Sequence, residues 1–135
     1  MGFVMTTELE GAMRLKTLAA FLLTVPEEKF DLSVWVKLTR DTPSPECGFA
    51  GCAVGWAAQI PEFKALGFGL GGILESCPEF EGRHSWQAVE DFFGLRFNDC
   101  ANLFTSVAYN EYHATPKEVS ERITQYLKTT AIFAV

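Results

Sequence analysis

Apolar residues recur at helical spacing near the start of the chain. Between Thr7 and Thr24 they fall at about every third or fourth position, which predicts an amphipathic helix that ends before Pro26. The apolar stripe of this helix consists of Leu9, Ala12, Met13, Ala20 and Leu23.

The pattern changes between Phe30 and Leu38, where apolar and polar residues largely alternate. Alternation by itself predicts a strand. The helical character of the rest of the chain favours a short helix capped by Asp31. Both interpretations stay open.

The middle of the chain is rich in small residues and glycine. The segment from Ala50 to Ile60 predicts a buried helix that stops before Pro61, and the next residues to Leu66 add a further turn. The five glycines between Gly67 and Gly82 predict a loop, with a short strand at Ile73 and Leu74.

Helix-start signals dominate the last third. A helix is predicted from a cap at Ser85 to Phe93, ended by Gly94, and another from a cap at Asn98 to about Ser106. The clearest signal is the capping box of Thr115 and Glu118, with Pro116 at the first helical position. The apolar stripe that follows consists of Val119, Ile123, Tyr126 and Leu127.

These patterns predict one domain over residues 1–135. We expect a mostly α-helical fold of five or six helices, with at most one short β-hairpin. The length of 135 residues and the apolar fraction of 48% suit a single hydrophobic core.

Composition excludes several function classes. The net charge of −6 argues against nucleic-acid binding, which needs Lys and Arg to neutralise phosphates. The helix predicted after Asn98 contains no Lys or Arg, which excludes a DNA-reading helix-turn-helix.

No apolar stretch is long enough to cross a membrane. A start at Met5 or Met13 is an alternative, and a start at Met13 would give a short secretory-like segment. The default expectation is a cytoplasmic protein with free thiols.

Candidate chemistry centres on the segment from Cys47 to Ala57. Cys52 is expected near a helix N-terminus, where unpaired N–H groups stabilise a thiolate. In an enzyme it would be the nucleophile, with His84 as its base; His113 is the only other histidine. The alternative, favoured here, is that this segment is a structural hub in which Cys52 and Trp56 are both buried.

Other site types fit the sequence less well. The four cysteines and two histidines lack the paired spacing of structural zinc sites, so neither a metal nor a cofactor is predicted. High aromatic content suggests a binding surface instead. The binding residues predicted for it are Trp35, Cys47, Gly48, Trp56 and Trp86.

An ordered set of motifs resembles a loose family of small bacteriophage and bacterial proteins. The motifs are Phe30-Asp31-Leu32-Ser33-Val34-Trp35, Cys47-Gly48-x₃-Cys52-Ala53-x-Gly55-Trp56-Ala57, Phe92-Phe93-Gly94-Leu95, Leu103-Phe104 and Ala114-Thr115-Pro116-Lys117-Glu118-Val119. The resemblance covers about residues 30–128, and it does not include Gly67–Gly72, Cys77 or Cys100. It implies a phage or prophage origin and assigns no activity.

Function remains a choice between two classes. The sequence favours a small binding or accessory protein that docks a host protein or sequesters a small polar ligand, because the residues of a catalytic site are sparse. The alternative is a cysteine-dependent enzyme that uses Cys52 and His84.

Overall fold

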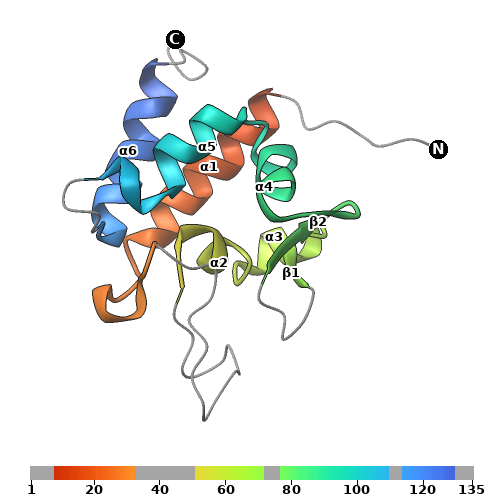
Figure 1. Ribbon diagram of the computed structural model, residues 1–135, viewed down its shortest axis with the longest axis horizontal. Coiled ribbons are helices and arrows are strands. Elements are labelled where there is room, and N and C mark those ends of the chain that lie inside the picture. The colour runs from red at the N-terminus through yellow and green to blue at the C-terminus, as the bar shows by residue number, and fades with distance from the viewer. Residues whose placement is uncertain (1–7, 33–50, 72–76, 110–113, 130–135) are drawn as a thin grey trace.

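A computed structural model describes residues 8–32, 51–71, 77–109 and 114–129 of the chain. The described residues form a mostly helical fold with a small antiparallel sheet, as the sequence predicts (Figure 1). The α-helices are α1 (Glu8–Leu22), α2 (Ala53–Ala57), α3 (Pro61–Ala65), α4 (Ser85–Phe93), α5 (Phe97–Phe104) and α6 (Pro116–Thr129). Two 3-10 turns, η1 (Glu27–Lys29) and η3 (Ser106–Ala108), join them. No helix among the described residues is both long and apolar enough to cross a bilayer.

Helix α1 lies at the centre of the helical packing and contacts α2, α4 and α6. Its contact with α6 brings together segments from opposite ends of the chain (Figure 1). Within it, the buried Ser120 hydroxyl donates a hydrogen bond of 2.7 Å to the Ala19 carbonyl oxygen. Pairing the hydroxyl removes the cost of burying a lone polar group and fixes how the two helices sit along each other.

Close packing also joins α1 to the end of α4. A Cβ atom on Gly11 would lie 2.7 Å from the Phe93 carbonyl carbon and 3.2 Å from the Gly94 nitrogen, so only glycine fits there without movement of the backbone. The Arg14 guanidinium donates a 2.7 Å hydrogen bond to the Phe92 carbonyl oxygen and lies 4.4 Å from the centre of the Phe92 ring. Arg14 therefore satisfies a carbonyl in the last turn of α4 from a different helix.

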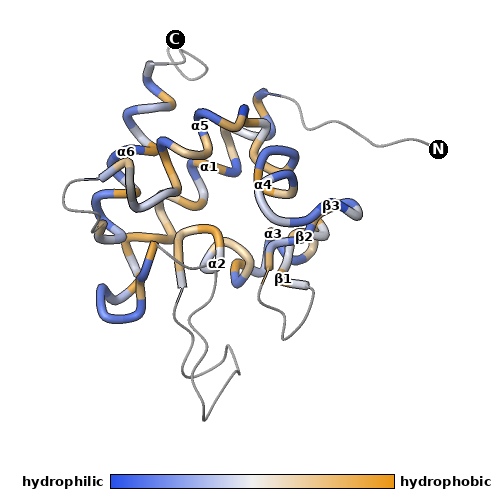
Figure 2. The backbone as a smooth tube through the Cα atoms, viewed as in Figure 1, coloured by the Kyte–Doolittle hydropathy of each residue, from blue (hydrophilic) through white to orange (hydrophobic). Residues whose placement is uncertain are grey.

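Aromatic rings fill the core beside α4. Phe92 stacks on Phe68 at 4.4 Å between ring centres and meets Phe63 edge-on at 4.9 Å. It also meets Phe80 at 5.1 Å and Phe93 at 5.0 Å, both edge-on. All five rings are buried. Figure 2 shows hydrophilic residues at the outer turns, around η1 and between the last two strands.

The glycine-rich segment contains strands where the sequence predicts a loop. Strands β1 (Gly69–Gly71), β2 (Cys77–Phe80) and β3 (Arg83–His84) form an antiparallel sheet in the order β1-β2-β3. In β1, Gly71 faces the Glu79 side chain, whose Oε2 atom would lie 2.5 Å from a Cβ at that position. The space that a side chain at position 71 would take is occupied by the Glu79 carboxylate. The predicted strand at Ile73 and Leu74 lies outside the described residues.

Two predicted helix caps are wrong and two helix signals are confirmed. His84 and Arg96, not Ser85 and Asn98, are the N-cap residues of α4 and α5, and neither uses its side chain as a cap. Gly94 ends α4 in the left-handed region, at φ 63°. At the start of α6, the Thr115 N–H donates to Glu118 Oε1 at 2.9 Å and the Glu118 N–H donates to Thr115 Oγ1 at 3.1 Å. The reciprocal bonds complete the predicted capping box.

The helix predicted over Ala50–Ile60 is only α2, Ala53–Ala57. Gly51 instead forms an isolated parallel bridge with Phe30, the first residue of the predicted strand or short helix. Residues 33–38 of that segment lie outside the described part of the chain, so its two interpretations stay predictions.

Candidate functional site

Cys52 is the N-cap residue of α2, and its side chain is buried. Its Sγ atom accepts a long hydrogen bond of 3.4 Å from the Gly55 N–H. Burial nevertheless dominates and raises the pKa of the Cys52 thiol to about 11. The N-terminus of a five-residue helix therefore does not offset burial, and Cys52 is a neutral thiol at neutral pH. A nucleophilic cysteine needs to be a thiolate.

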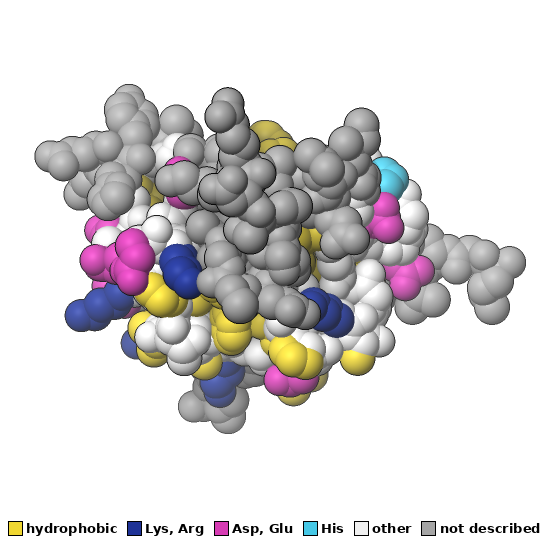
Figure 3. All heavy atoms as spheres, turned by 90° about the horizontal axis from the view of Figure 1, so that it is seen from below, with side chains coloured by type: hydrophobic (Ala, Val, Ile, Leu, Met, Phe, Trp, Pro, Cys, Tyr) yellow, Lys and Arg dark blue, Asp and Glu magenta, His cyan; other side chains and the backbone are white. Residues whose placement is uncertain are grey.

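The predicted base lies in a different environment. His84 belongs to β3, its side chain is 59% exposed, and its Nδ1 atom lies 3.2 Å from Glu79 Oε2. In Figure 3 the histidine (cyan) lies at the surface next to an acidic side chain. The Cys52 Sγ atom accepts from the Gly55 N–H, and His84 Nδ1 lies beside Glu79, so the described contacts do not pair Cys52 with His84. The geometry therefore disfavours the nucleophile–base pair.

Burial predicts that Cys52 reacts slowly with alkylating reagents. At neutral pH the Cys52 thiol is protonated, because burial raises its pKa to about 11. We expect iodoacetamide to modify Cys52 far more slowly than the half-buried Cys77, with peptide mass spectrometry as the readout. Labelling of Cys52 at the rate of Cys77 in the folded protein would revive the enzyme hypothesis.

The predicted binding residues do not assemble into a site among the described residues. Trp35, Cys47 and Gly48 lie outside those residues. Trp56 and Trp86 are half-buried and pack against the core. The prediction that Cys52 is buried is confirmed, whereas Trp56, predicted to be buried with it, is buried only in part. The Trp56 indole N–H donates to the Lys29 carbonyl oxygen at 3.1 Å, which ties α2 to η1. Trp56 therefore has a structural role.

Metal-ligand side chains are dispersed over the described segments. No group of three or more His, Cys, Asp or Glu side chains there could hold an ion. Cys52 and Cys100 are buried in the core and Cys77 lies half-buried in β2, each without a disulfide.

The strongest candidate surface is on α1, whose apolar stripe faces away from the core. The buried residues of α1 are Gly11, Ala12, Leu15, Leu18, Ala19 and Leu22. Of the predicted stripe only Ala12 is among them. Leu9, Met13 and Leu23 are 53%, 56% and 64% exposed, and Ala20 is exposed as well. We call these four residues the α1 stripe.

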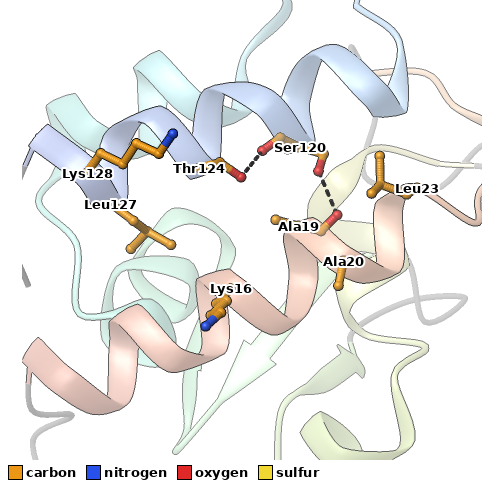
Figure 4. Close-up of a pocket in the computed structure, with 8 residues that line it drawn as sticks. All are labelled: Lys16, Ala19, Ala20, Leu23, Ser120, Thr124, Leu127 and Lys128. Carbon is orange, nitrogen blue, oxygen red and sulfur yellow. Dashed lines mark hydrogen bonds between the residues drawn. The ribbon is translucent and has the colours of Figure 1, made fainter. Parts of the chain in front are cut away.

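The exposed side of α1 borders a groove shared with α6. This α1–α6 groove has a volume of about 400 Å³. It is lined by Lys16, Ala19, Ala20, Leu23, Ser120, Thr124, Leu127 and Lys128 (Figure 4). The volume lies within the usual range for ligand sites, about 300 to 1,000 Å³. The α1 stripe and the groove overlap at Ala20 and Leu23.

Polar groups in the groove are already engaged with each other. The Ser120 hydroxyl donates to Ala19, and the Thr124 hydroxyl donates to the Ser120 carbonyl oxygen at 3.0 Å. Both hydroxyl groups therefore donate their hydrogen bonds within the fold and not to a bound molecule. The rest of the lining is mostly apolar, so the groove offers mainly apolar contact.

A second hollow lies at the other side of α1, between α1, α5 and α6. It measures about 190 Å³, and its lining includes Glu8, Arg96, Asp99 and Tyr126. The Tyr126 hydroxyl donates a long hydrogen bond of 3.4 Å to Asp99 Oδ2, and burial raises the pKa of Tyr126 to about 12. Its size is below that of ordinary ligand sites.

The comparisons assign no family. No family model matches the chain, and neither the curated proteins nor the solved structures compared with it show a significant similarity. Inference about function therefore rests on the geometry of α1 and α6.

Helical spacing in the sequence identifies the residues of the α1 stripe, but it does not show that this face is exposed. The residues recur at helical spacing, but Leu15, Leu18 and Leu22 make a second apolar face on the same helix. The exposed face is only partly apolar, because Lys16 lies on it between Met13 and Ala20. The exposure of this face makes it a candidate interaction surface.

Proposed function

We propose that this protein is a binding protein that docks a protein partner through the α1 stripe and the adjoining α1–α6 groove. The observation that carries the proposal is the exposure of Leu9 and Met13 on α1, and of Leu23 directly after its end, while the opposite face of α1 lies in the core. Apolar side chains gathered on an exposed face commonly mark an interaction site. In keeping with the phage-family resemblance, the proposal places the protein in a bacterial host cytoplasm, as an accessory protein.

The proposal prefers a protein partner to a small ligand. The α1 stripe extends over 14 residue steps, or about 21 Å at the helical rise per residue. This length exceeds that of a typical small metabolite. The hydroxyls of the groove, on Ser120 and Thr124, are engaged within the fold. A small polar ligand would lack the fixed donors that such sites use.

The same geometry supports binding over cysteine chemistry. Cys52 is buried with a raised pKa, and His84 points to Glu79. A catalytic cysteine needs an accessible thiolate and a base within hydrogen-bond reach.

The test compares two leucine-to-aspartate variants in capture from bacterial lysate. Leu23→Asp places a charge in the α1 stripe, whereas Leu66→Asp changes a leucine of similar exposure, 48%, at the end of α3 and outside the groove. We expect a defined partner to be retained by the unmodified protein and by Leu66→Asp, and to be lost with Leu23→Asp. Equal capture by both variants, or no specific capture at all, would refute the proposal.

A further inference from the structure

We infer that residues 131–135, which follow α6 in the sequence, bind in the α1–α6 groove of the same chain and compete there with the partner. This inference rests on the proposed function, since it gives the docking surface a regulation: the groove is covered until a partner displaces the covering segment. The segment reads Ala131-Ile132-Phe133-Ala134-Val135, and we call it the 131–135 segment.

The 131–135 segment is five consecutive apolar residues, with no charged or polar side chain among them. Exposed runs of about three or more apolar residues are avoided in globular proteins unless they serve a function. Such a run needs an apolar surface to cover it. The described part of the chain offers one beside the last turn of α6, in the α1–α6 groove.

The apolar part of the groove is short. On α1 it extends only from Ala19 to Leu23, because Lys16 is exposed and interrupts this face of the helix. On α6 it consists of Leu127. The four residue steps on α1 measure about 6 Å at the helical rise. An extended chain covers that length with about two residues, so a short extended segment fits the lining.

The volume of the groove suits two large side chains. It measures about 400 Å³, whereas an apolar cavity of about 150 Å³ holds one benzene molecule. The groove therefore has room for the phenyl ring of Phe133 and for the branched side chain of Ile132. Ala19 and Ala20 leave this space open because their own side chains are small (Figure 4).

The groove begins where α6 ends. Helices α1 and α6 run in opposite directions, so Lys128 lies toward one end of the groove, and Ser120 and Leu23 lie toward the other (Figure 4). The eight residue steps from Ser120 to Lys128 measure about 12 Å. Residues 132–135 span that distance when extended, at about 3.3 Å each. The two residues that follow α6 are then left to reverse the direction of the chain.

A second apolar segment outside the described residues starts farther from the groove. Residues 3–5 are Phe, Val and Met, and they precede α1, which begins at Glu8. The lining on α1 starts eight residues after Glu8, or about 12 Å along the helix. Lys128, by contrast, belongs to the lining and lies in the last turn of α6. Phe3 is therefore the matched control for Phe133.

Attachment to α6 makes even a weak apolar contact sufficient. A short linker holds a tethered segment at an effective concentration in the millimolar range. A segment whose Kd as a free peptide is about tenfold lower than this concentration covers the groove in about nine molecules of ten. A partner then finds the groove open in about one molecule of ten, so its apparent affinity falls about tenfold.

Photo-cross-linking tests the contact itself. The cross-linker p-benzoylphenylalanine replaces Phe133 or, as the control, Phe3, and mass spectrometry of the irradiated monomer locates the attachment. We expect position 133 to attach to residues 19–23 or 120–128, and position 3 not to attach there. Attachment from position 133 should be lost in Leu23→Asp and kept in Leu66→Asp, which changes a leucine outside the groove.

The fluorescent dye anilinonaphthalene sulfonate tests whether the segment covers the groove, because this dye binds exposed apolar surface. We expect Phe133→Asp to bind the dye about tenfold more tightly than the unmodified protein, and Phe3→Asp to bind it unchanged. Adding Leu23→Asp to Phe133→Asp should remove the gain. Capture of the lysate partner should likewise rise in Phe133→Asp and stay unchanged in Phe3→Asp. Equal dye binding and equal capture by the two variants would refute the competition.

The cross-linking outcomes separate this inference from the proposed function. Attachment of position 133 outside the groove, while partner capture still depends on Leu23, refutes the 131–135 segment as the occupant and leaves the docking surface intact. Attachment in the groove, while Leu23→Asp captures the partner normally, refutes the docking surface and the competition and keeps only the contact. Attachment mainly between two molecules assigns the groove to a second copy of the chain, and equal attachment from positions 3 and 133 removes the choice of segment. Either of these last two results overturns the inference.

Discussion

Replacing Phe92 by alanine is expected to lower the free energy of unfolding by about 3 to 5 kcal/mol, the usual cost of deleting a buried phenyl ring. The Phe92 ring contacts four other buried rings and the Arg14 guanidinium, so its loss leaves a cavity that several groups border. The total free energy of unfolding of a natural domain is only about 5 to 15 kcal/mol. Urea denaturation followed by circular dichroism would measure the change, together with a fall in Tm of about 10 °C or more.

The chain contains a matched control for that variant. Phe97 opens α5 and is 57% exposed, so Phe97→Ala removes the same ring from a surface position. We expect its free energy of unfolding to stay within about 0.5 kcal/mol of the unmodified protein. Equal losses for Phe92→Ala and Phe97→Ala would contradict the position of the aromatic core.

Gly11→Ala is expected to destabilise the fold by about 2 kcal/mol although alanine is the better helix former. Alanine gains about 1 kcal/mol in helix propensity over glycine. Against that gain, its Cβ would collide with the backbone of Phe93 and Gly94, which cannot retreat as a side chain can. Overpacking of this kind costs up to about 3 kcal/mol. Thermal unfolding should show a Tm lower by about 7 °C.

Gly69→Ala tests whether the loss at Gly11 comes from contact. No atom lies within 4 Å of a Cβ built on Gly69, and its φ lies outside the region that alanine rarely adopts. This variant should leave the free energy of unfolding unchanged or raise it slightly, because alanine restricts the unfolded chain. A stable Gly11→Ala protein would show that α1 and α4 do not approach as closely as described.

Local signals in the sequence predicted the helices that carry their own start and stop. The Thr115–Glu118 capping box and the Gly94 helix end involve only residues a few positions apart. Such helix boundaries can therefore be recognised from the local sequence, without knowledge of the tertiary structure. Helices α4 and α5 were located correctly, yet their caps were not, because His84 and Arg96 hold the N-cap positions without a side-chain bond.

Features that depend on distant partners escaped prediction. The strand at Gly69–Gly71 exists because β2 pairs with it, and its glycines carry no strand preference of their own. For Cys52 the sequence offered two interpretations, a thiolate at a helix N-terminus and a buried thiol; burial, which was the favoured one, is confirmed and raises the pKa. For the candidate site, spacing located the α1 stripe but could not choose between two apolar faces, since α6 and α4 make that choice.

The pairing of α1 with α6 has a consequence for how the chain folds during synthesis. The hydrogen bond between Ser120 and Ala19 closes a separation of 101 residues, so the covering helix is made long after the helix it covers. At about 5 to 20 residues per second, α1 waits roughly 5 to 20 seconds for α6. During that interval the part of the α1 core face that α6 covers stays exposed on the nascent chain, while α2 and α4 are already available to pack on α1. The completed fold hides this face and keeps the opposite face of α1 at its surface.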